Sequence, residues 1–348
     1  MPTKIKFNKI IRDLIGGLAE RQQQILAGRF GLNETGPVTL ARLGENYNIT
    51  RERVRQIESF SLDTIKKRPP SDDFRLLIEL VKNYLKNAGG LKREDQLFAD
   101  LHKLLKTGST PTTDNQLRFL LEASSEFSFS KETPATAAFW FIPGDAKKKA
   151  LEFIKELLMV LKARRKEVVE ANGFQNVFAV LAKEHNLTEA VALNYAMISR
   201  KFVKNSYGEH GLSSWREINP RTARDWAHLV LRKGKKPLHF TDIAKIVNEI
   251  RGDKKIHHQT IHNELIKNDK FVLVGKGMYG LKEFGLIPGT AREVIQHLIK
   301  EHGPLSPDEL LDRILKERLV KPNTVLINLQ NQKYFERLDN GRYNIRAV

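Results

Sequence analysis

The hydrophobic residues near the start of the chain recur at the three- and four-residue spacing of amphipathic helices. This pattern runs through residues 5–30 and is followed by a loop rich in glycine, asparagine and proline. Thr39 and Thr50 then stand where N-cap residues are expected, each just before a new helical pattern. The first of these patterns ends at Asn46, so the sequence predicts two helices joined by a short polar turn.

From residue 72 onward a second pattern repeats four times along the chain. Each repeat has three helix-period segments followed by two strand-like segments rich in aromatic and β-branched residues, the outline of a small winged helix. The predicted helices span residues 74–88, 96–105, 116–123, 150–161, 174–185, 188–202, 226–231, 240–251, 259–268, 291–301, 307–317 and 323–331. The predicted hairpins lie within residues 127–141, 202–215, 271–284 and 335–345.

The predicted hairpins are related by an internal repeat. Phe271, Gly277 and Tyr279 recur 64 positions later as phenylalanine, glycine and tyrosine, and Phe202 and Gly208 recur 69 positions later as phenylalanine and glycine. A period near 65 residues is too long for a solenoid unit and suits a small winged helix. The glycines fit a tight hairpin tip, and the aromatic residues fit a strand that packs on the helices.

Together these patterns predict a mainly α fold, in which a helix-turn-helix domain is followed by about four small α/β winged-helix modules. Pro69-Pro70-Ser71 is expected to be a short, stiff linker after the first domain. The expected domains are 1–68 for the helix-turn-helix, 72–145 for a diverged winged helix, and 150–222, 223–289 and 290–348 for three further winged helices.

The distribution of charge singles out two of these domains. The chain of 348 residues has a formal net charge of +18, a balance that attracts nucleic-acid phosphates. Residues 1–68 carry 13 basic and 7 acidic side chains, and residues 223–289 carry the same numbers, so these two domains hold two thirds of the excess. Residues 69–150, with 12 basic and 11 acidic side chains, are nearly neutral and are expected to contact protein.

Composition excludes several kinds of protein. The chain has no cysteine, which excludes disulfides, thiolate zinc sites and cysteine nucleophiles. No apolar run approaches the ~20 residues of a membrane span, and the N-terminus lacks the apolar core and cleavage site of a signal peptide. We therefore expect a cytoplasmic protein without membrane contact.

The second helix of the N-terminal pair carries the clearest candidate chemistry. Arg51, Glu52, Arg55 and Gln56 lie on one face near its start, away from the apolar face that includes Val54. Arginine pairs with guanine and glutamine with adenine through two hydrogen bonds each, so such a face can read the major groove of DNA. The alternative is a charged helix face that meets only solvent.

Residues 18–67 resemble region 4, the C-terminal domain of bacterial housekeeping sigma factors. The resemblance rests on LAERQQQILAGRFGL and TLARLGENYNITRERVRQIE, above all on TRERVRQIE at Thr50–Glu58. It implies a domain that reads an upstream promoter element and docks on the flap of the RNA polymerase β subunit. The implied base-reading residues are Arg51, Glu52, Arg55 and Gln56, and the implied contacts to the DNA backbone are Arg21, Arg29, Thr39 and Arg53.

Two departures limit what this resemblance implies. After Glu58 the family has a basic helix end that meets activators, whereas this chain has Phe60, Asp63 and Thr64. The sigma segments that hold the polymerase core and melt the promoter have no counterpart in the sequence. We therefore expect that the protein does not start transcription alone.

Residues 224–288 resemble a second family, the HARE-HTH winged helix of the RNA polymerase delta subunit and of chromatin and restriction proteins. The resemblance rests on KPLHFTDIAKIV and KFVLVGKGMYGLKEF, with a weaker copy at Tyr207–Ile218. It implies a winged helix that binds RNA polymerase or DNA.

The same module has a histidine-rich stretch at the expected start of its third helix. His258 and His262 stand four residues apart, as zinc ligands on one helix face do, but no carboxylate takes the usual third place. Nucleic-acid contact is the favoured interpretation, a solvated surface is the alternative, and no metal is expected. The residues of this possible second nucleic-acid site are Lys254, Lys255, His257, His258, Gln259, His262 and, at the hairpin tip, Lys276.

No pattern of a nucleotide-binding loop, a serine hydrolase or a zinc hydrolase occurs in the sequence, so we expect no enzyme activity, no cofactor and no small-molecule substrate. The favoured function is a DNA-binding regulator of transcription initiation, with double-stranded DNA and the RNA polymerase core as partners. The alternatives are a polymerase-independent repressor or architectural protein with several helix-turn-helix units, and the DNA-binding part of a restriction system.

Overall fold

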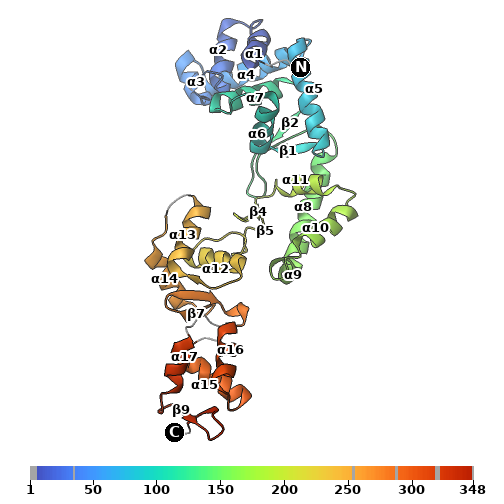
Figure 1. Ribbon diagram of the computed structural model, residues 1–348. Helices are drawn as coiled ribbons and strands as arrows, with labels where there is room; N and C mark the ends of the chain where they lie inside the picture. The colour runs from blue at the N-terminus through green and yellow to red at the C-terminus, as the bar shows by residue number, and fades with distance from the viewer. Residues whose placement is uncertain (1–5, 34–35, 253–254, 287–288, 318–321, 347–348) are drawn as a thin grey trace. The chain divides into compact units, whose positions relative to one another are not determined.

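The computed structural model describes residues 6–33, 36–252, 255–286, 289–317 and 322–346 (Figure 1). The protein is mainly helical and has small antiparallel sheets, which confirms the predicted fold class. The chain divides into two compact bodies. The N-terminal body contains residues 1–203 and 210–213, and the C-terminal body contains residues 204–209 and 214–348.

The N-terminal body begins with four helices: α1 (Phe7–Ile15), α2 (Glu20–Phe30), α3 (Leu40–Tyr47) and α4 (Arg51–Lys66). Thr39 caps α3 by accepting a hydrogen bond from the backbone N–H of Arg42 at 3.3 Å, and Thr50 caps α4 by accepting one from the N–H of Arg53 at 3.1 Å. Asn48, with a left-handed φ of 56°, ends α3 and turns the chain toward α4. Both predicted caps are therefore confirmed.

The remaining elements follow one order four times, with small variations: a helix, a short strand, two helices and a hairpin. The first repeat contains α5 (Asp72–Asn87), β1 (Leu91–Arg93), α6 (Glu94–Leu105), α7 (Pro111–Ala123), β2 (Ser128–Ser130) and β3 (Phe139–Phe141). The second repeat contains α8 (Ala146–Ala163), α9 (Arg165–Val169), α10 (Phe174–Glu184), α11 (Glu189–Ala196), β4 (Phe202–Lys204) and β5 (His210–Leu212). The third repeat contains α12 (Ala223–Gly234), β6 (Leu238–His239), α13 (Phe240–Arg251), α14 (His258–Lys267), β7 (Phe271–Gly275), β8 (Met278–Leu281) and the 3₁₀ turn η1 (Lys282–Phe284). The fourth repeat contains α15 (Ala291–His302), α16 (Pro307–Glu317), α17 (Pro322–Leu329), β9 (Phe335–Arg337) and β10 (Tyr343–Ile345).

The sheets of these repeats share a topology. The first and third repeats have three-stranded antiparallel sheets in the orders β1-β3-β2 and β6-β8-β7, with the last strand in the centre. In the fourth repeat an isolated bridge from Leu305 to Tyr343 takes the place of the first strand beside the hairpin β9–β10. The second repeat has the hairpin β4–β5.

Glycines with a left-handed backbone stand near the tips of three of these hairpins. Gly208, Gly277 and Gly341 have φ values of +85°, +69° and +80°, a conformation that side chains with a Cβ rarely adopt. The recurrence of these glycines in the sequence therefore has a direct conformational cause.

Some predicted boundaries were wrong. The helix predicted over 188–202 is α11, which ends at Ala196. Beyond it the backbone pairs with the first repeat, because the N–H of Arg200 donates to the carbonyl of Ala135 and Ser199 bridges Thr136. Strands β1 and β6 were not predicted, since three and two residues are too few to leave a periodic pattern.

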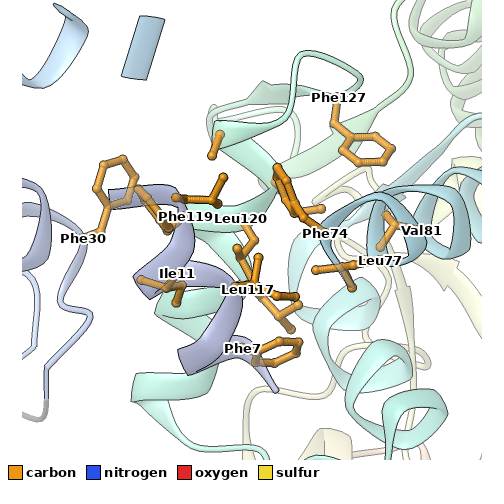
Figure 2. Close-up of a cluster of buried hydrophobic side chains, with 14 of the residues drawn as sticks. Phe7, Ile11, Phe30, Phe74, Leu77, Val81, Leu117, Phe119, Leu120 and Phe127 are labelled. Atoms are coloured by element: carbon orange, nitrogen blue, oxygen red, sulfur yellow. The ribbon is translucent and has the colours of Figure 1, made fainter. Parts of the chain in front are cut away.

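One hydrophobic core joins α1, α2 and the end of α4 to the first repeat (Figure 2). It contains Phe7 of α1, Phe30 of α2, Phe74 of α5 and both Leu117 and Phe119 of α7. The rings of Phe30 and Phe119 meet edge to face, with centroids 5.2 Å apart. The predicted domains 1–68 and 72–145 thus share one core inside the N-terminal body.

The C-terminal body has a separate core for each of its repeats. One is built on Ile243, Val247 and Ile261, and the other on Ile295, Ile314 and Val325, each closed by hairpin side chains. The two bodies therefore use the repeated order of elements differently, since the N-terminal body has merged its first repeat with a preceding domain.

The helix directly before each hairpin, here called the pre-hairpin helix, has the same register in all four repeats. These helices are α7, α11, α14 and α17. Each buries the residues that stand ten and six positions before a buried phenylalanine at the start of the hairpin. The buried pairs are Leu117 and Leu121, Ala192 and Ala196, Ile261 and Leu265, and Val325 and Leu329, before Phe127, Phe202, Phe271 and Phe335. Equivalent positions can therefore be compared among the four repeats.

Candidate nucleic-acid interface

Helix α4 turns its apolar side into the domain and its charged side to solvent. Val54 is fully buried with Ile25 of α2 and Leu43 of α3, so α4 is fixed against both neighbours. On the opposite side the four predicted base-reading residues, Arg51, Glu52, Arg55 and Gln56, are all exposed, as is Arg53. The structure brings them together in the first two turns of a capped helix, where they can enter a groove of DNA.

The exposed side chains of α4 are paired along the helix. The guanidinium of Arg55 donates to both carboxylate oxygens of Glu52 at 2.7–3.1 Å, and Arg53 donates to the Oε1 of Gln56 at 3.1 Å. The hydrogen bond from Arg55 lowers the pKa of Glu52 below its ordinary value, and the same contact raises the pKa of Arg55. Glu52 therefore holds Arg55 in place, and Arg55 must leave this partner to pair with a base.

The residues implied to contact the DNA backbone divide into two kinds. Arg21 is exposed, donates to the carbonyl of Tyr47 at 2.8 Å and lies over the Tyr47 ring, so it borders the turn before α4. Arg29 is half-buried, pairs with Glu58 of α4 at 3.3 Å and donates to the carbonyl of Val38 at 3.4 Å. Arg29 thus ties α2 to α4 inside the domain, a role that its sequence position did not indicate.

The possible second nucleic-acid site lies on α14 and the adjacent hairpin. His257 caps α14 through its Nδ1, which accepts from the N–H of Gln259 at 3.2 Å. His262 stacks on Phe240 of α13, with ring centroids 4.3 Å apart, and Gln259 donates to Asn263 at 3.3 Å. The first turns of α14 therefore present imidazole and amide groups, and the imidazole of His262 is held by the ring of Phe240.

The basic residues of this second site lie before α14 and at the tip of the hairpin that follows it. Lys255 is exposed just before the helix, and Lys276 is exposed in the turn between β7 and β8. Lys254 lies outside the described residues. Within the described parts of the chain, no cluster of three or more histidine, aspartate or glutamate side chains is arranged to hold a metal ion. The arrangement suits hydrogen bonding to a polyanion.

Two other pre-hairpin helices, α7 and α11, are in contact with segments that come earlier in the chain. On α7, Asn115 donates to the carbonyl of Gly31 and Gln116 donates to Asn8, at 3.3 Å and 2.6 Å. On α11, Asn194 donates to the carbonyls of Ala88 and Leu91 at 2.7 Å and 2.6 Å. Sequence reasoning missed these contacts, although Phe119 in the middle of α7 was a signal that this face is buried.

The geometry of α3 and α4, with two capped helices, a tight turn and an exposed polar face, is that of a helix-turn-helix. Residues 14–67 match the family described as Sigma-70, region 4. The region 4 segment covers the end of α1 and all of α2, α3 and α4. The resemblance stated for these residues is thereby confirmed, whereas the resemblance of residues 224–288 to the HARE-HTH family stays a prediction.

Several sigma factors are similar to this region 4 segment. RNA polymerase sigma factor SigA2 of Synechococcus elongatus is 41% identical over 58 residues, which are 17% of this chain and 18% of that protein. RNA polymerase principal sigma factor HrdC of Streptomyces coelicolor is 42% identical over 67 residues, 19% of each chain. RNA polymerase sigma factor SigA4 of Synechococcus elongatus is 45% identical over 49 residues, 14% of this chain and 16% of the relative. The chain thus spans less than a fifth of the length of these relatives.

Among the described residues, no helix is both long and apolar enough to cross a membrane. The region 4 family is a non-enzymatic, DNA-binding family of transcription proteins. The region 4 segment is therefore a DNA-binding element of the kind used in transcription initiation.

Proposed function

We propose that this protein is a DNA-binding regulator of transcription initiation that acts at RNA polymerase and is not an enzyme. The observation that carries the proposal is the capped helix α4, whose exposed residues Arg51, Glu52, Arg55 and Gln56 stand in the region 4 segment. In this proposal α4 enters the major groove of promoter DNA, and Arg55 and Gln56 pair with bases. A cytoplasmic location follows from this function.

Thr39 and Arg29 have structural tasks that suit the same proposal. Thr39 caps α3, and Arg29 joins α2 to α4 through Glu58, so both fix the orientation of α4 from within the domain. Arg21 and Arg53, which are exposed, remain the better candidates for phosphate contacts. A positioning residue would affect stability as well as DNA affinity.

The proposed contact with the β flap of RNA polymerase has less room than in an isolated domain. Helix α7 packs on α1, α2 and α4 and shares their core, so the side of these helices that faces α7 is occupied by the chain itself. A flap contact would have to use the remaining surface of the region 4 segment. Polymerase contacts elsewhere on the chain are therefore part of the proposal.

We further propose that residues 223–289 form a winged helix with a second nucleic-acid site. The order helix, strand, helix, helix and hairpin, with a central last strand, supports the winged-helix interpretation. The exposed Gln259 and His258 on α14, the exposed Lys255 before it and the exposed Lys276 at the hairpin tip support contact with duplex DNA.

The test of α4 is the affinity of the full chain for a promoter-like duplex, measured by fluorescence anisotropy. Changing Arg55 and Gln56 to alanine should weaken specific binding by about 1–3 kcal/mol for each paired base that the side chain no longer reaches. The matched control is Arg75→Ala, because Arg75 is an exposed arginine of α5 outside the reading face. Equal affinity and sequence preference in the double variant and the control would refute DNA reading by α4.

The alternative function is a polymerase-independent repressor or architectural protein. It is distinguished by co-purification of the full chain with bacterial core RNA polymerase. A chain that binds promoter-like DNA tightly but never the core enzyme would favour the alternative.

A further inference from the structure

Six aromatic side chains of the third repeat form one connected cluster around the start of α14. The ring centroid of Phe240 lies 4.5 Å from that of His239, 6.0 Å from that of His258 and 4.3 Å from that of His262. The ring of His258 also lies 4.2 Å from that of His257, and the ring of His262 lies 5.8 Å from that of Tyr279. These residues are here called the ring cluster: His239, Phe240, His257, His258, His262 and Tyr279.

The ring cluster runs from the core of the repeat to its surface. Tyr279 is buried, Phe240 and His262 are half-buried, and His257 and His258 are exposed. Within the described residues the run of ring contacts therefore ends at two imidazoles that meet solvent. A planar group that stacks on either imidazole continues the run and removes ring surface from water.

Two of these histidines are held in place because each caps a helix. The Nδ1 of His257 accepts from the N–H of Gln259 at 3.2 Å, and the Nδ1 of His239 accepts from the N–H of Thr241 at 3.4 Å. His239 also lies so close to Gly277 of the hairpin turn that a Cβ could not fit there. Rings that are already oriented lose little conformational freedom when a ligand stacks on them.

The second repeat has residues without rings at the exposed end. Counted from the hairpin phenylalanine, His257 and His258 stand where Thr188 and Glu189 stand before and in α11. The hydroxyl of Thr188 is a preferred N-cap group, and the carboxylate of Glu189 suits a helix N-terminus. The first turn of α14, all of it described, has no acidic residue. Capping therefore does not account for the two histidines, and no carboxylate stands in this turn to repel a phosphate.

The chemistry of this surface selects a nucleobase that is not paired. Lys255 and Lys276 are exposed, and residues 223–289 carry 13 basic and 7 acidic side chains, so the module attracts phosphates. In a duplex the face of each base is stacked on its neighbours, and only the edges can be reached from the grooves. An unpaired base instead offers its face to an aromatic ring.

We infer that the ring cluster binds unpaired bases of single-stranded DNA, so that the third repeat meets DNA where its two strands separate. His257 and His258 stack on the unpaired bases, and Gln259 keeps its contact with the adjoining duplex. This inference rests on the proposed function, in which residues 223–289 hold a second nucleic-acid site and the chain acts at transcription initiation, where promoter DNA is opened.

The test uses the full chain with Arg55→Ala and Gln56→Ala, which weaken the contribution of α4, and measures binding by fluorescence anisotropy. Three probes share one duplex: a blunt form, a form extended by a single strand of thymines, and a form extended by the same number of abasic nucleotides. The abasic extension keeps the phosphates and lacks the bases. The thymine form should therefore bind about five-fold or more tightly than the abasic form, the gain expected from stacking one base.

Variants of the exposed histidines assign this gain to their rings. His258→Gln should remove it, whereas His258→Phe, which keeps an aromatic ring, should retain it. His257→Thr should reduce the gain while keeping α14 capped, as Thr188 caps α11. The matched control is His297→Gln, because His297 is an exposed histidine of α15 in the same body. Circular dichroism of each variant checks that the fold is kept.

The other outcomes separate failure of the inference from failure of the proposed function. Equal affinity for the thymine and abasic forms would mean that the ring cluster takes no base, while the duplex contact stands. If Gln259→Ala and Lys276→Ala also leave the affinity for the blunt form unchanged, the proposed second nucleic-acid site falls with the inference. An equal loss in His258→Gln and His258→Phe would refute stacking, and tighter binding of a form extended by uridine ribonucleotides would assign the rings to RNA and overturn the DNA strand.

Discussion

Helices α7 and α14 are the pre-hairpin helices of the first and third repeats, but they differ in what their equivalent faces contact. Helix α7 is a brace, because this face packs on the preceding helices, whereas the same face of α14 is polar and exposed. Eight positions before the hairpin phenylalanine, α7 has the fully buried Phe119, whereas α14 has the exposed Asn263. Twelve positions before it, Asn115 donates to Gly31, whereas Gln259 is exposed and bonds only within its own helix among the contacts described. The shared order of elements therefore does not determine what this face of the pre-hairpin helix contacts.

The difference shows how the N-terminal body fixes the helices of its region 4 segment. Because α7 shares a core with α1, α2 and the end of α4, the region 4 segment cannot turn independently of the first repeat. The third repeat keeps its own core, and Gln259 and Asn263 on the corresponding face of α14 are exposed. The same order of elements therefore either packs on a neighbouring domain, as in the first repeat, or keeps this helix face exposed, as in the third.

The largest expected effect comes from removing the brace. Phe119→Ala should cost about 3–5 kcal/mol of the unfolding free energy of the N-terminal body, because a fully buried phenylalanine leaves a cavity. The chain has three tryptophans, and Trp140 belongs to the core that contains Phe119. Replacing Trp215 and Trp226 by phenylalanine leaves Trp140 as the only indole, and its fluorescence in urea then reports this core.

The matched control for Phe119 is the equivalent residue on α14. Asn263→Ala removes an exposed side chain, so its effect on stability should stay within about 0.5 kcal/mol. Equal unfolding midpoints for the Phe119→Ala and Asn263→Ala chains would contradict the view that α7 is a brace and α14 is not.

A smaller effect is expected from removing the polar face of α14. In a chain that already carries Arg55→Ala and Gln56→Ala, the change Gln259→Ala should weaken the remaining duplex-DNA affinity by about 1–3 kcal/mol if it makes a paired base contact. Lys276→Ala should instead reduce the slope of log affinity against log salt by about 1, as expected for a phosphate contact. Both are measured by fluorescence anisotropy at several salt concentrations.

The control for the Gln259→Ala change on α14 is a change at the equivalent position of another pre-hairpin helix, α17. Asn323 stands on α17 where Gln259 stands on α14, so Asn323→Ala should leave DNA affinity unchanged. If Asn323→Ala and Gln259→Ala have the same effect, α14 has no special part in DNA binding.

Periodicity and capping predicted much of this architecture, because they act through neighbouring residues. Thr39 and Thr50 identified α3 and α4, and the spacing of phenylalanine and glycine identified the repeated hairpins. The long-range contacts had no such local signal. Residues 198–200 lie outside the helix and pair with residues 135–137, which stand about 60 positions earlier in the chain.

The candidate site shows the same limit. The exposure of Arg51, Glu52, Arg55 and Gln56 followed from helical spacing alone. The ion pair of Arg29 with Glu58 and the cover provided by α7 depend on packing between distant segments, so the sequence marked Arg29 only as a DNA-backbone residue. Helical spacing describes the face of one helix and cannot say what lies against it.

The smallest expected effect concerns a carboxyl group where α7 meets the region 4 segment. Five positions before the hairpin phenylalanine, α14 has the exposed Ile266, whereas α7 has Glu122. Burial raises the pKa of Glu122 above its ordinary value of 4.5, and the nearby Glu58 raises it further. The folded state therefore holds this proton more tightly than the unfolded state, so the contribution of Glu122 to stability is fully present below pH 4.5 and is lost as the pH rises through the raised pKa. Glu122→Gln should raise the urea midpoint near pH 7 and leave it unchanged near pH 4, whereas Glu79→Gln, an exposed carboxyl on α5, should change neither. A Glu122→Gln chain with the same pH profile as the wild type would mean that α7 does not bury this group against α2 and α4.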